Sequence, residues 1–373
     1  MFWINQVNLM TSRENNRLDY LDVLRGVAAL AVLVQHVFGY LYHTNETFQP
    51  LKPYFKFLIA DMVDWGRFGV VLFFLISGFI IPHSLKPGTT LNKFVINRTF
   101  RLYPAYWLTL VLIIVSAPYL EQAQSTYSIA QFAANVTMVP KLFGIKEMSD
   151  VFWTLFIEVL FYGCCIGLFT VKWLDKPICM GLVAIGLNLT TPVAIIFNNL
   201  SMFHMPVQFV LFHLSFLFAG NLLRLALIHH EKHAQTLCWI FMSLCCLTVP
   251  LATGLLFPVI EATRTGFVMF SPQSVAFAYS LAIGLFIYAI YFKTLNNKFM
   301  VGMGEISYSL YLLHMLCFVL VAKFISFETF SSVLTFLVAS AFLTYWVAKA
   351  SFTFVEYPAI RFGKKIIQSR GYL

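Results

Sequence analysis

The amino-acid sequence predicts an all-α, polytopic membrane protein with about ten transmembrane helices and both termini in the cytoplasm. Three observations predict this class. Of the 373 residues, 60% are hydrophobic and only 11% are charged, whereas soluble domains have roughly 45–50% and about 25%. The aromatic content of 17% excludes a disordered chain, because disordered segments are poor in aromatic residues. The apolar residues are also grouped into long stretches.

Ten apolar stretches are long enough to cross a bilayer, which takes about 20 helical residues. They are residues 20–42, 65–83, 102–119, 151–171, 177–197, 205–228, 236–257, 275–292, 302–325 and 330–353. We therefore predict a cytoplasmic segment at 1–19, a transmembrane domain at 20–358 and a short basic cytoplasmic tail at 359–373. Residues 1–19 do not resemble a cleaved signal, because they are polar and no small-residue cleavage site follows them.

The distribution of basic residues predicts the orientation. With the N-terminus inside, 16 of the 25 lysines and arginines fall in cytoplasmic segments and 6 in outer ones, as the positive-inside rule requires. The net charge of +9 therefore indicates topology and contact with lipid headgroups rather than nucleic acid. The seven cysteines lie in or beside apolar stretches and are odd in number, which favours packing over disulfides or zinc.

The first predicted span contains two ionisable residues on one helical face, Arg25 and His36. Each charged residue at the centre of a bilayer costs about 2.5–3.5 kcal/mol on insertion scales, so such residues are informative. Arg25 and His36 are eleven residues apart, which places them on the same face and about 16 Å apart along the axis. A histidine satisfied within the bundle is the structural alternative for His36, and the alignment with Arg25 favours a functional role.

The second span has polar groups at both ends. Asp61, Asp64 and Arg67 cluster at its outer end, where they either contact a substrate or cap and pair with one another. Ser77 and Gly78 form a small patch among phenylalanines. Tight helix packing is the structural explanation for this patch, and a gap for a thin ligand arm is the functional one.

Arginines precede the third span on its cytoplasmic side. Arg98 and Arg101 follow an i, i+3 spacing, so both side chains can point the same way. Topological anchoring is one explanation. The other is a clamp for phosphate groups, because arginine forks match phosphate geometry.

The fourth and ninth spans place further polar residues near the expected level of His36. Glu158 lies about 10 Å below the outer end of the fourth span, and an isolated buried carboxylate needs a partner. Ser307, Tyr311 and His314 share one face of the ninth span, with His314 about 18 Å above its inner end. The polar residues thus form an inner layer and an outer layer. We expect no metal site at the loop histidines His229, His230 and His233, which lack acidic or thiol neighbours in sequence.

Taken together, the ordered motifs resemble acyltransferase family 3, integral-membrane O-acyltransferases of bacterial surface polysaccharides. The motifs are Arg25-x10-His36, Phe73-Phe74 with Ser77-Gly78-Phe79, Arg98-x-x-Arg101, Trp153-Thr-Leu with Glu158, and Ser307-Tyr308 with Tyr311 and His314. The resemblance extends from Leu18 to about Phe362. It implies ten core spans, and it implies the stand-alone type, which lacks an extracytoplasmic hydrolase-like domain.

The resemblance also implies a reaction. The donor would be a cytoplasmic acyl-CoA, usually acetyl-CoA, with no permanently bound cofactor and no metal. The acceptor would be a sugar hydroxyl of a surface polysaccharide or lipid-linked glycan, such as lipopolysaccharide O-antigen, outside the bacterial inner membrane. The expected donor-binding residues are Arg25, Arg98, Arg101, Ser77 and Gly78. The expected acceptor-binding residues are Asp61, Asp64, Arg67, Trp153 and Tyr311.

For the chemistry we predict that His36 is the catalytic base and that Glu158 or His314 orients it or shares its proton. A covalent acyl-His36 intermediate is a second route. The alternative function is a transporter or flippase for a glycan precursor or acyl group, since buried charges also serve proton paths. The absence of an inverted repeat and the arginines at the inner mouth favour the acyltransferase. A scaffold protein is the third possibility. Neither the acceptor sugar nor the oligomeric state can be derived from the sequence.

Overall fold

The computed structural model describes residues 2–44, 47–86, 88–119, 127–196, 207–258, 270–292, 295 and 297–372, with side chains from Asp19 onward except at 194, 196 and 256. The described chain consists of helices joined by turns and contains no strand. The predicted all-α class is therefore confirmed.

The long helices follow the predicted order. They are α1 (Phe2–His43), α3 (Trp65–Ile80), α4 (Leu91–Ser116), α6 (Trp153–Thr170), α7 (Pro177–Ile196), α8 (Val207–Leu227), α9 (Lys232–Leu251), α11 (Pro272–Phe292), α13 (Ser307–Ala322) and α14 (Phe330–Ser351). The shorter elements include α2 (Lys52–Lys56), α5 (Ile129–Val136), α12 (Lys298–Glu305), α15 (Tyr357–Ser369), the 3-10 turn η3 (Pro82–Ser84), and the π-helical turns η2 (Phe57–Met62), η6 (Ala252–Leu256) and η7 (Phe352–Glu356).

Each of the ten apolar stretches contains helix. Among the described residues, eight helical stretches are long and apolar enough to cross a bilayer, and a ninth does so if α12 and α13 form one broken span. The apolar part of α7, Pro177–Val193, is shorter. These findings confirm a polytopic membrane protein, while the cytoplasmic location of the termini stays a prediction.

One predicted span, 302–325, is interrupted rather than continuous. The axes of α12 and α13 differ by 74°, and the break lies at Ile306. Gly304 brings the end of α12 against α1 so closely that a Cβ there would collide with the carbonyl oxygen of Asp22. Hydropathy averaged over the span does not show the break, because the polar residues Glu305 and Ser307 lie within an otherwise apolar stretch. As a result, α13 begins inside the protein with Ser307.

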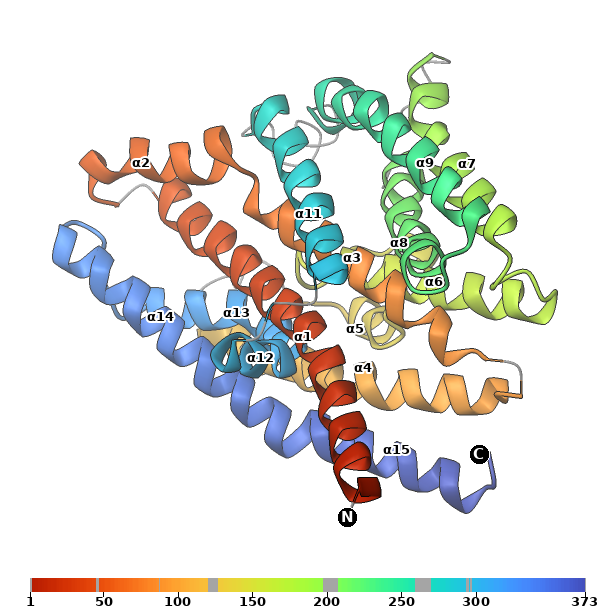
Figure 1. Cartoon of the computed structure of the whole chain (residues 1–373). Coiled ribbons are helices and arrows are strands. Elements are labelled where there is room, and N and C mark those ends of the chain that lie inside the picture. The colour runs from red at the N-terminus through yellow and green to blue at the C-terminus, as the bar shows by residue number, and fades with distance from the viewer. Residues whose placement is uncertain are drawn as a thin grey trace.

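The helices form two groups with α1 and α3 between them. Figure 1 shows α14 and α15 as a long rod on one side and α7, α8 and α9 together on the other. The contacts of α3 with both α1 and α8 join the groups. All but one of the side chains from Phe209 to Ala226 in α8 are buried. At the crossing of α3 and α8, a Cβ on Gly78 would collide with the carbonyl oxygen of Leu217, so small residues permit this close approach.

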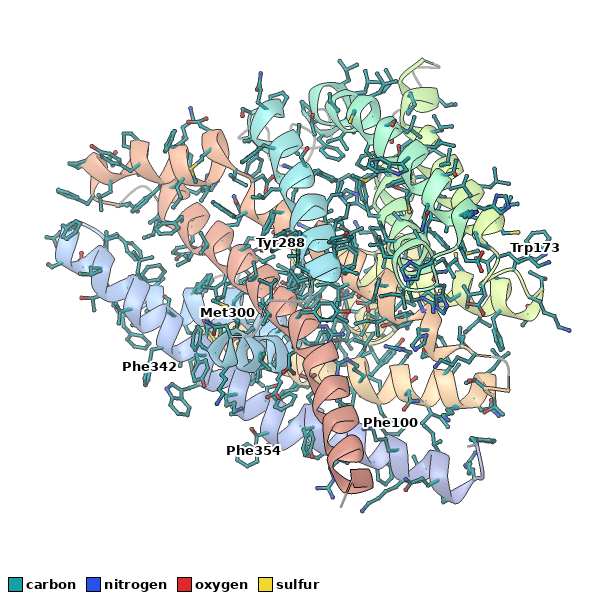
Figure 2. All side chains as sticks on the ribbon, viewed as in Figure 1. Phe100, Trp173, Tyr288, Met300, Phe342 and Phe354 are labelled. Atoms are coloured by element: carbon teal, nitrogen blue, oxygen red, sulfur yellow. The ribbon has the colours of Figure 1, made fainter. Side chains whose placement is uncertain are left out.

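The outer surface of the bundle is apolar. Phe342 of α14 is 66% exposed and Phe354 of η7 is 77% exposed, and Figure 2 shows both side chains projecting away from the helices. A water-soluble protein rarely exposes large aromatic side chains in such numbers. Lipid contact accounts for this surface.

The segment between α5 and α6 is folded into the protein. Tyr106 of α4 donates a hydrogen bond of 2.9 Å to the carbonyl of Asn135. Met138, Val151 and Phe152 are at most 2% exposed. Helix α6 therefore begins within the bundle rather than at its surface. Its residues lie deeper in the protein than a helix that starts at the surface would place them.

Candidate active site

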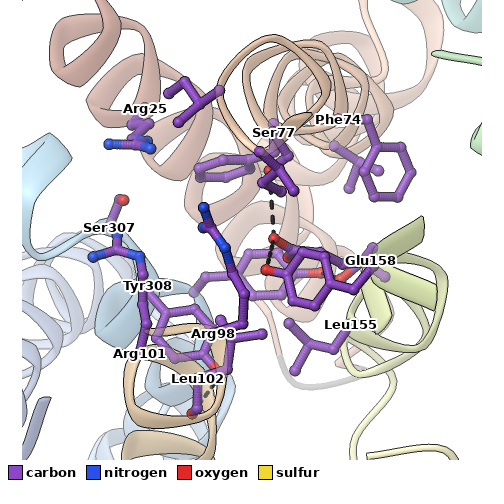
Figure 3. Close-up of a pocket in the computed structure, with 17 residues that line it drawn as sticks. Arg25, Phe74, Ser77, Arg98, Arg101, Leu102, Leu155, Glu158, Ser307 and Tyr308 are labelled. Atoms are coloured by element: carbon purple, nitrogen blue, oxygen red, sulfur yellow. Dashed lines mark hydrogen bonds between the residues drawn. The ribbon is translucent and has the colours of Figure 1, made fainter. Parts of the chain in front are cut away.

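An open cavity with about 780 Å³ of empty space lies between α1, α3, α4, α6 and α13 (Figure 3). Six of the predicted site residues line it. They are Arg25, Ser77, Arg98, Arg101, Glu158 and Tyr311. The fold thus brings together residues that come from five helices.

Three arginines line this cavity, with Arg25 and Arg101 on the side away from Glu158 and Arg98 between them and Glu158 (Figure 3). Arg25 is held by an ion pair of 2.8 Å with Asp22. Arg98 donates a hydrogen bond of 3.2 Å to the Ser84 hydroxyl, and its guanidinium carbon lies 5.7 Å from the centre of the Tyr162 ring. Like charges in a partly dry space repel one another, so the group is suited to an anionic ligand.

Arg101 lines the cavity one turn after Arg98. Among the described residues, it forms no ion pair and no hydrogen bond of its side chain. Its planar fork is therefore available for bidentate contact with a phosphate.

Glu158 lies on the same face of α6 as Tyr162 and Thr154, which are one turn below and one turn above it. The Tyr162 hydroxyl donates a hydrogen bond of 2.7 Å to Glu158 Oε1, and the Ser77 hydroxyl donates one of 3.5 Å to the same oxygen. These contacts place Glu158 in the cavity with the arginines. It does not lie beside His36, where the sequence places it.

Tyr311 and Thr154 close the outer end of the cavity. The Tyr311 hydroxyl donates a hydrogen bond of 2.8 Å to the carbonyl of Val151, and it lies 2.7 Å from the Thr154 hydroxyl. Phe73 packs edge-on against the Tyr311 ring, with 6.0 Å between ring centroids. The cavity thus has arginines towards one end and the rings of Phe73 and Tyr311 at the other.

The two predicted histidines meet just past this closed end. His314 Nε2 lies 2.9 Å from His36 Nδ1, and the rings stack with centroids 5.0 Å apart. His314 is 1% exposed, whereas His36 is partly exposed. Tyr311 lies one turn before His314 on α13, with 6.1 Å between their rings. The histidine pair is therefore adjacent to the cavity end.

The hydrogen bonds determine which nitrogens carry protons in the neutral pair. The Leu310 carbonyl oxygen lies 3.2 Å from His314 Nδ1. A carbonyl only accepts, so this nitrogen carries the proton and His314 Nε2 holds a lone pair. That lone pair accepts a hydrogen bond from His36 Nδ1–H. His36 Nε2 then keeps its lone pair, and no described side chain donates a hydrogen bond to it. His36 Nε2 is therefore in a position to accept a proton, and its role as a base stays a prediction.

Three residues predicted to contact the acceptor lie at the outer end of α3. Asp64 caps α3 by accepting a hydrogen bond of 2.8 Å from the backbone N–H of Arg67, and their side chains form an ion pair. Arg67 also lies over the rings of Phe257 and Phe270, at 5.1 and 5.0 Å. Asp61 is exposed on η2. These contacts correspond to the capping and pairing alternative, and acceptor binding stays a prediction.

The other two residues that the structure places away from the cavity lining are Gly78 and Trp153. Gly78 faces the backbone of α8, as the packing alternative predicts. Trp153 packs against His213 and Phe209, with ring centroids 5.3 and 5.0 Å away. Both residues support helices that form the cavity.

Sequence reasoning missed a buried histidine, His213 on α8, which is 0% exposed. Its Nδ1 lies 2.7 Å from the Phe209 carbonyl, and its Nε2 lies 2.7 Å from the Tyr279 hydroxyl. Nδ1–H therefore donates and Nε2 accepts, which leaves no free nitrogen. The apolar surroundings of His213 in the sequence gave no signal that could separate this structural histidine from a catalytic one.

A second missed group surrounds Arg224, which is 5% exposed. Its guanidinium contacts His83 Nδ1 at 3.0 Å, His229 Nε2 at 3.3 Å and Asp175 Oδ1 at 3.2 Å. The same guanidinium donates to Asn221 Oδ1. Because these partners come from four segments, the cluster fixes the inner ends of α3, α7 and α8.

Comparison with known proteins identifies similar sequences. A model of the acyltransferase domain family matches residues 18–349. The curated protein Nodulation protein 10 of Rhizobium leguminosarum bv. viciae is 25% identical over 160 residues, which cover 38% of this chain and 41% of that protein. The chain thus matches less than half the length of this relative. No solved structure matches the chain.

Proposed function

This chain belongs to the acyltransferase domain family, and from this premise we propose that it transfers an acyl group from cytoplasmic acyl-CoA to a sugar hydroxyl outside the bacterial inner membrane. That it is a membrane acyltransferase follows from the family and from its apolar helices. The observation that carries the finer proposal is the histidine pair beside the closed end of an arginine-lined cavity.

The arginines support an anionic donor. Arg25, Arg98 and Arg101 line the cavity, and their guanidinium groups match the phosphates of CoA in charge and geometry. Along α1, Arg25 and His36 are about 16 Å apart. An extended pantetheine arm has a comparable reach, so phosphates on the arginines would leave the thioester near Tyr311 and the histidines.

His36 supports transfer to a hydroxyl. A sugar hydroxyl is a weak nucleophile at neutral pH and needs a base as it attacks. His36 Nε2 accepts the hydroxyl proton while the new O–C bond forms at the acyl carbon. The C–S bond then breaks, and the CoA thiolate takes the proton back from His36. His314 holds His36 Nδ1 throughout and stabilises the charged intermediate state of the ring.

Acetyl is the acyl group that we propose, and a surface polysaccharide or lipid-linked glycan is the acceptor. The lone pair of His36 Nε2 would also serve as a nucleophile in a covalent route. Rapid quenching of the enzyme with labelled acetyl-CoA separates the two routes, because only the covalent route leaves label on the protein before acceptor is added. The transporter alternative receives no support from the family match.

The test is direct. Purified protein in lipid nanodiscs is mixed with acetyl-CoA and a glycan extract, and free CoA is measured over time. The proposal predicts CoA release that depends on the acceptor and disappears in His36→Ala. CoA release that is equal without acceptor, or equal in the variant, would contradict it. Mass spectrometry of surface glycans from cells with and without the protein then identifies the acetylated sugar.

A further inference from the structure

Glu158 differs from the other polar groups of the cavity because half of its carboxylate is unused. Both hydrogen bonds that it accepts, from Tyr162 and Ser77, go to Oε1. No described residue donates to Oε2, and no described arginine forms an ion pair with Glu158. Oε2 faces the open cavity, where it can accept a hydrogen bond from a bound ligand in place of water.

The position of Glu158 in the cavity determines which part of a bound ligand must carry the hydrogen-bond donor for Oε2. The residues at i, i+4 and i+8 on this face of α6 are Thr154, Glu158 and Tyr162, and successive members are about 6 Å apart along the axis. Tyr162 marks the arginine end, because Arg98 lies over its ring. Thr154 marks the closed end, because its hydroxyl contacts Tyr311. Glu158 is therefore midway between the two ends.

The two hydrogen bonds to Oε1 also fix the direction of the carboxylate. Tyr162 and Ser77 belong to different helices, α6 and α3, so they hold the group from two sides. Figure 3 shows both bonds converging on Glu158, with Arg25 and Arg101 on the other side of the cavity. Oε2 is thus presented in a defined orientation rather than on a free side chain, which favours recognition of a specific donor group.

We propose that Glu158 recognises the pantetheine arm of acyl-CoA through Oε2. The inference rests on the proposed function and adds a contact to it. Between its pyrophosphate and its sulfur, the arm carries one hydroxyl and two amide N–H groups, which are the only donors in that stretch. With phosphates on the arginines and the thioester near Tyr311, these donors pass Glu158. The residue then selects a polar arm over a plain alkyl chain of equal length.

This role is separate from proton transfer at the histidines. Among the described residues, Glu158 makes no hydrogen bond to His36 or His314. Thr154 and Tyr311 lie between them and Glu158. Glu158 therefore binds the donor, and loss of its charge affects donor affinity first.

The experiment compares CoA with a ligand that shares its 3′-phosphate and its first 5′-phosphate but lacks the second phosphate of the pyrophosphate and the arm. Binding of CoA and of adenosine 3′,5′-bisphosphate, which lacks pantetheine, is measured by calorimetry on the full-length protein in nanodiscs. Glu158→Gln should weaken CoA binding about tenfold or more and leave bisphosphate binding within twofold. Arg98→Gln is the matched control and should weaken both ligands. Retained bisphosphate binding shows that the Glu158 variant is folded.

The outcomes separate the two proposals. If the unmodified protein binds the bisphosphate and CoA equally well, or if Glu158→Gln weakens neither ligand, the arm contact is wrong while the donor assignment stands. If the unmodified protein does not bind CoA, the proposed function itself fails. If Glu158→Gln loses both ligands, Tyr162→Phe decides. This variant removes only a support of the carboxylate and should weaken CoA alone, and equal weakening of both ligands would overturn the inference.

Discussion

Two histidine sites within the bundle have the same residue type and opposite properties. At the first, His314 Nε2 lies 2.9 Å from His36 Nδ1, and no side chain that the structure describes contacts His36 Nε2 through a hydrogen bond. At the second, Phe209 and Tyr279 occupy both nitrogens of His213. His36 is partly exposed, whereas His213 is fully buried. The first site keeps a lone pair available for chemistry and the second does not.

The comparison teaches that the two histidines differ in free hydrogen-bonding capacity, and this difference is the basis on which we propose a catalytic role for His36 and a structural role for His213. Both rings lie in apolar spans, and burial of each polar ring costs free energy of desolvation. Both sites contact residues that line the cavity, His314 through Tyr311 and His213 through Phe74, with ring centroids 6.1 and 6.0 Å apart. They differ in whether a ring nitrogen remains available. Variants of each site should therefore affect different quantities, namely turnover at the first and stability at the second.

The largest effect is expected for His36→Ala. Loss of the base should lower the turnover number for acyl transfer by about 100–10,000-fold. The dissociation constant for CoA should stay within about twofold, because the arginines that bind it are untouched. Steady-state CoA release and calorimetry measure the two quantities. A variant that is folded, binds CoA and retains normal turnover would contradict the assignment of His36.

His314 offers a way to sharpen the comparison, because its role depends on one acceptor atom. His314→Ala should lower turnover by about 10–100-fold, the size usually found for residues that orient a functional histidine. His314→Gln supplies an amide oxygen that can accept from His36 Nδ1–H, and it should recover most of that loss. Equal activity of the two variants, measured as turnover at saturating acyl-CoA, would show that orientation is not the function of His314.

A smaller effect is expected for Arg101→Gln, which removes one phosphate-binding fork. We expect the Michaelis constant for acyl-CoA to rise about tenfold, the usual cost of one hydrogen bond to a charged group. Turnover at saturation should change less. Arg361→Gln is the control, since Arg361 is exposed on α15 and does not line the cavity. If both substitutions raise the Michaelis constant equally, the cavity arginines have no special role.

The smallest effect on turnover is expected at the second histidine site. His213→Leu should leave acyl transfer within about twofold but lower the free energy of unfolding by about 1–3 kcal/mol, because the Tyr279 hydroxyl loses its acceptor. Adding Tyr279→Phe removes the orphaned hydroxyl and should restore part of the stability. Thermal unfolding in nanodiscs measures both variants. A loss of turnover without a loss of stability would break the comparison.

Much of the fold could be predicted, because hydropathy directly reports which residues contact lipid. The ten apolar stretches contain helix for this reason, and the rise per residue placed His36 and His314 at one level before their contact was known. The break at Ile306 could not be predicted, since it depends on the close contact of Gly304 with α1, and helix–helix contacts leave no periodic trace.

Glu158 shows where depth arguments fail. A depth calculated from the end of the span assumes that α6 starts at the membrane surface. The residues before it, Met138, Val151 and Phe152, are buried, so the helix starts inside the protein. Glu158 therefore lies in the cavity with the arginines. His213 and Arg224 show a second reason why parts of the site could not be predicted. Their hydrogen-bond partners, Tyr279 and Asp175, lie 66 and 49 positions away in sequence. These contacts become visible only in the folded structure.

The central claim is that only the histidine with a free ring nitrogen performs the transfer. Its most direct test measures acceptor-dependent CoA release for His36→Ala and for the His213→Leu, Tyr279→Phe double variant, side by side at equal amounts of folded protein. The account predicts a loss of at least about 100-fold in the first and a rate within about twofold of the unmodified protein in the second. Equal rates in the two variants, or a larger loss in the second, would contradict it.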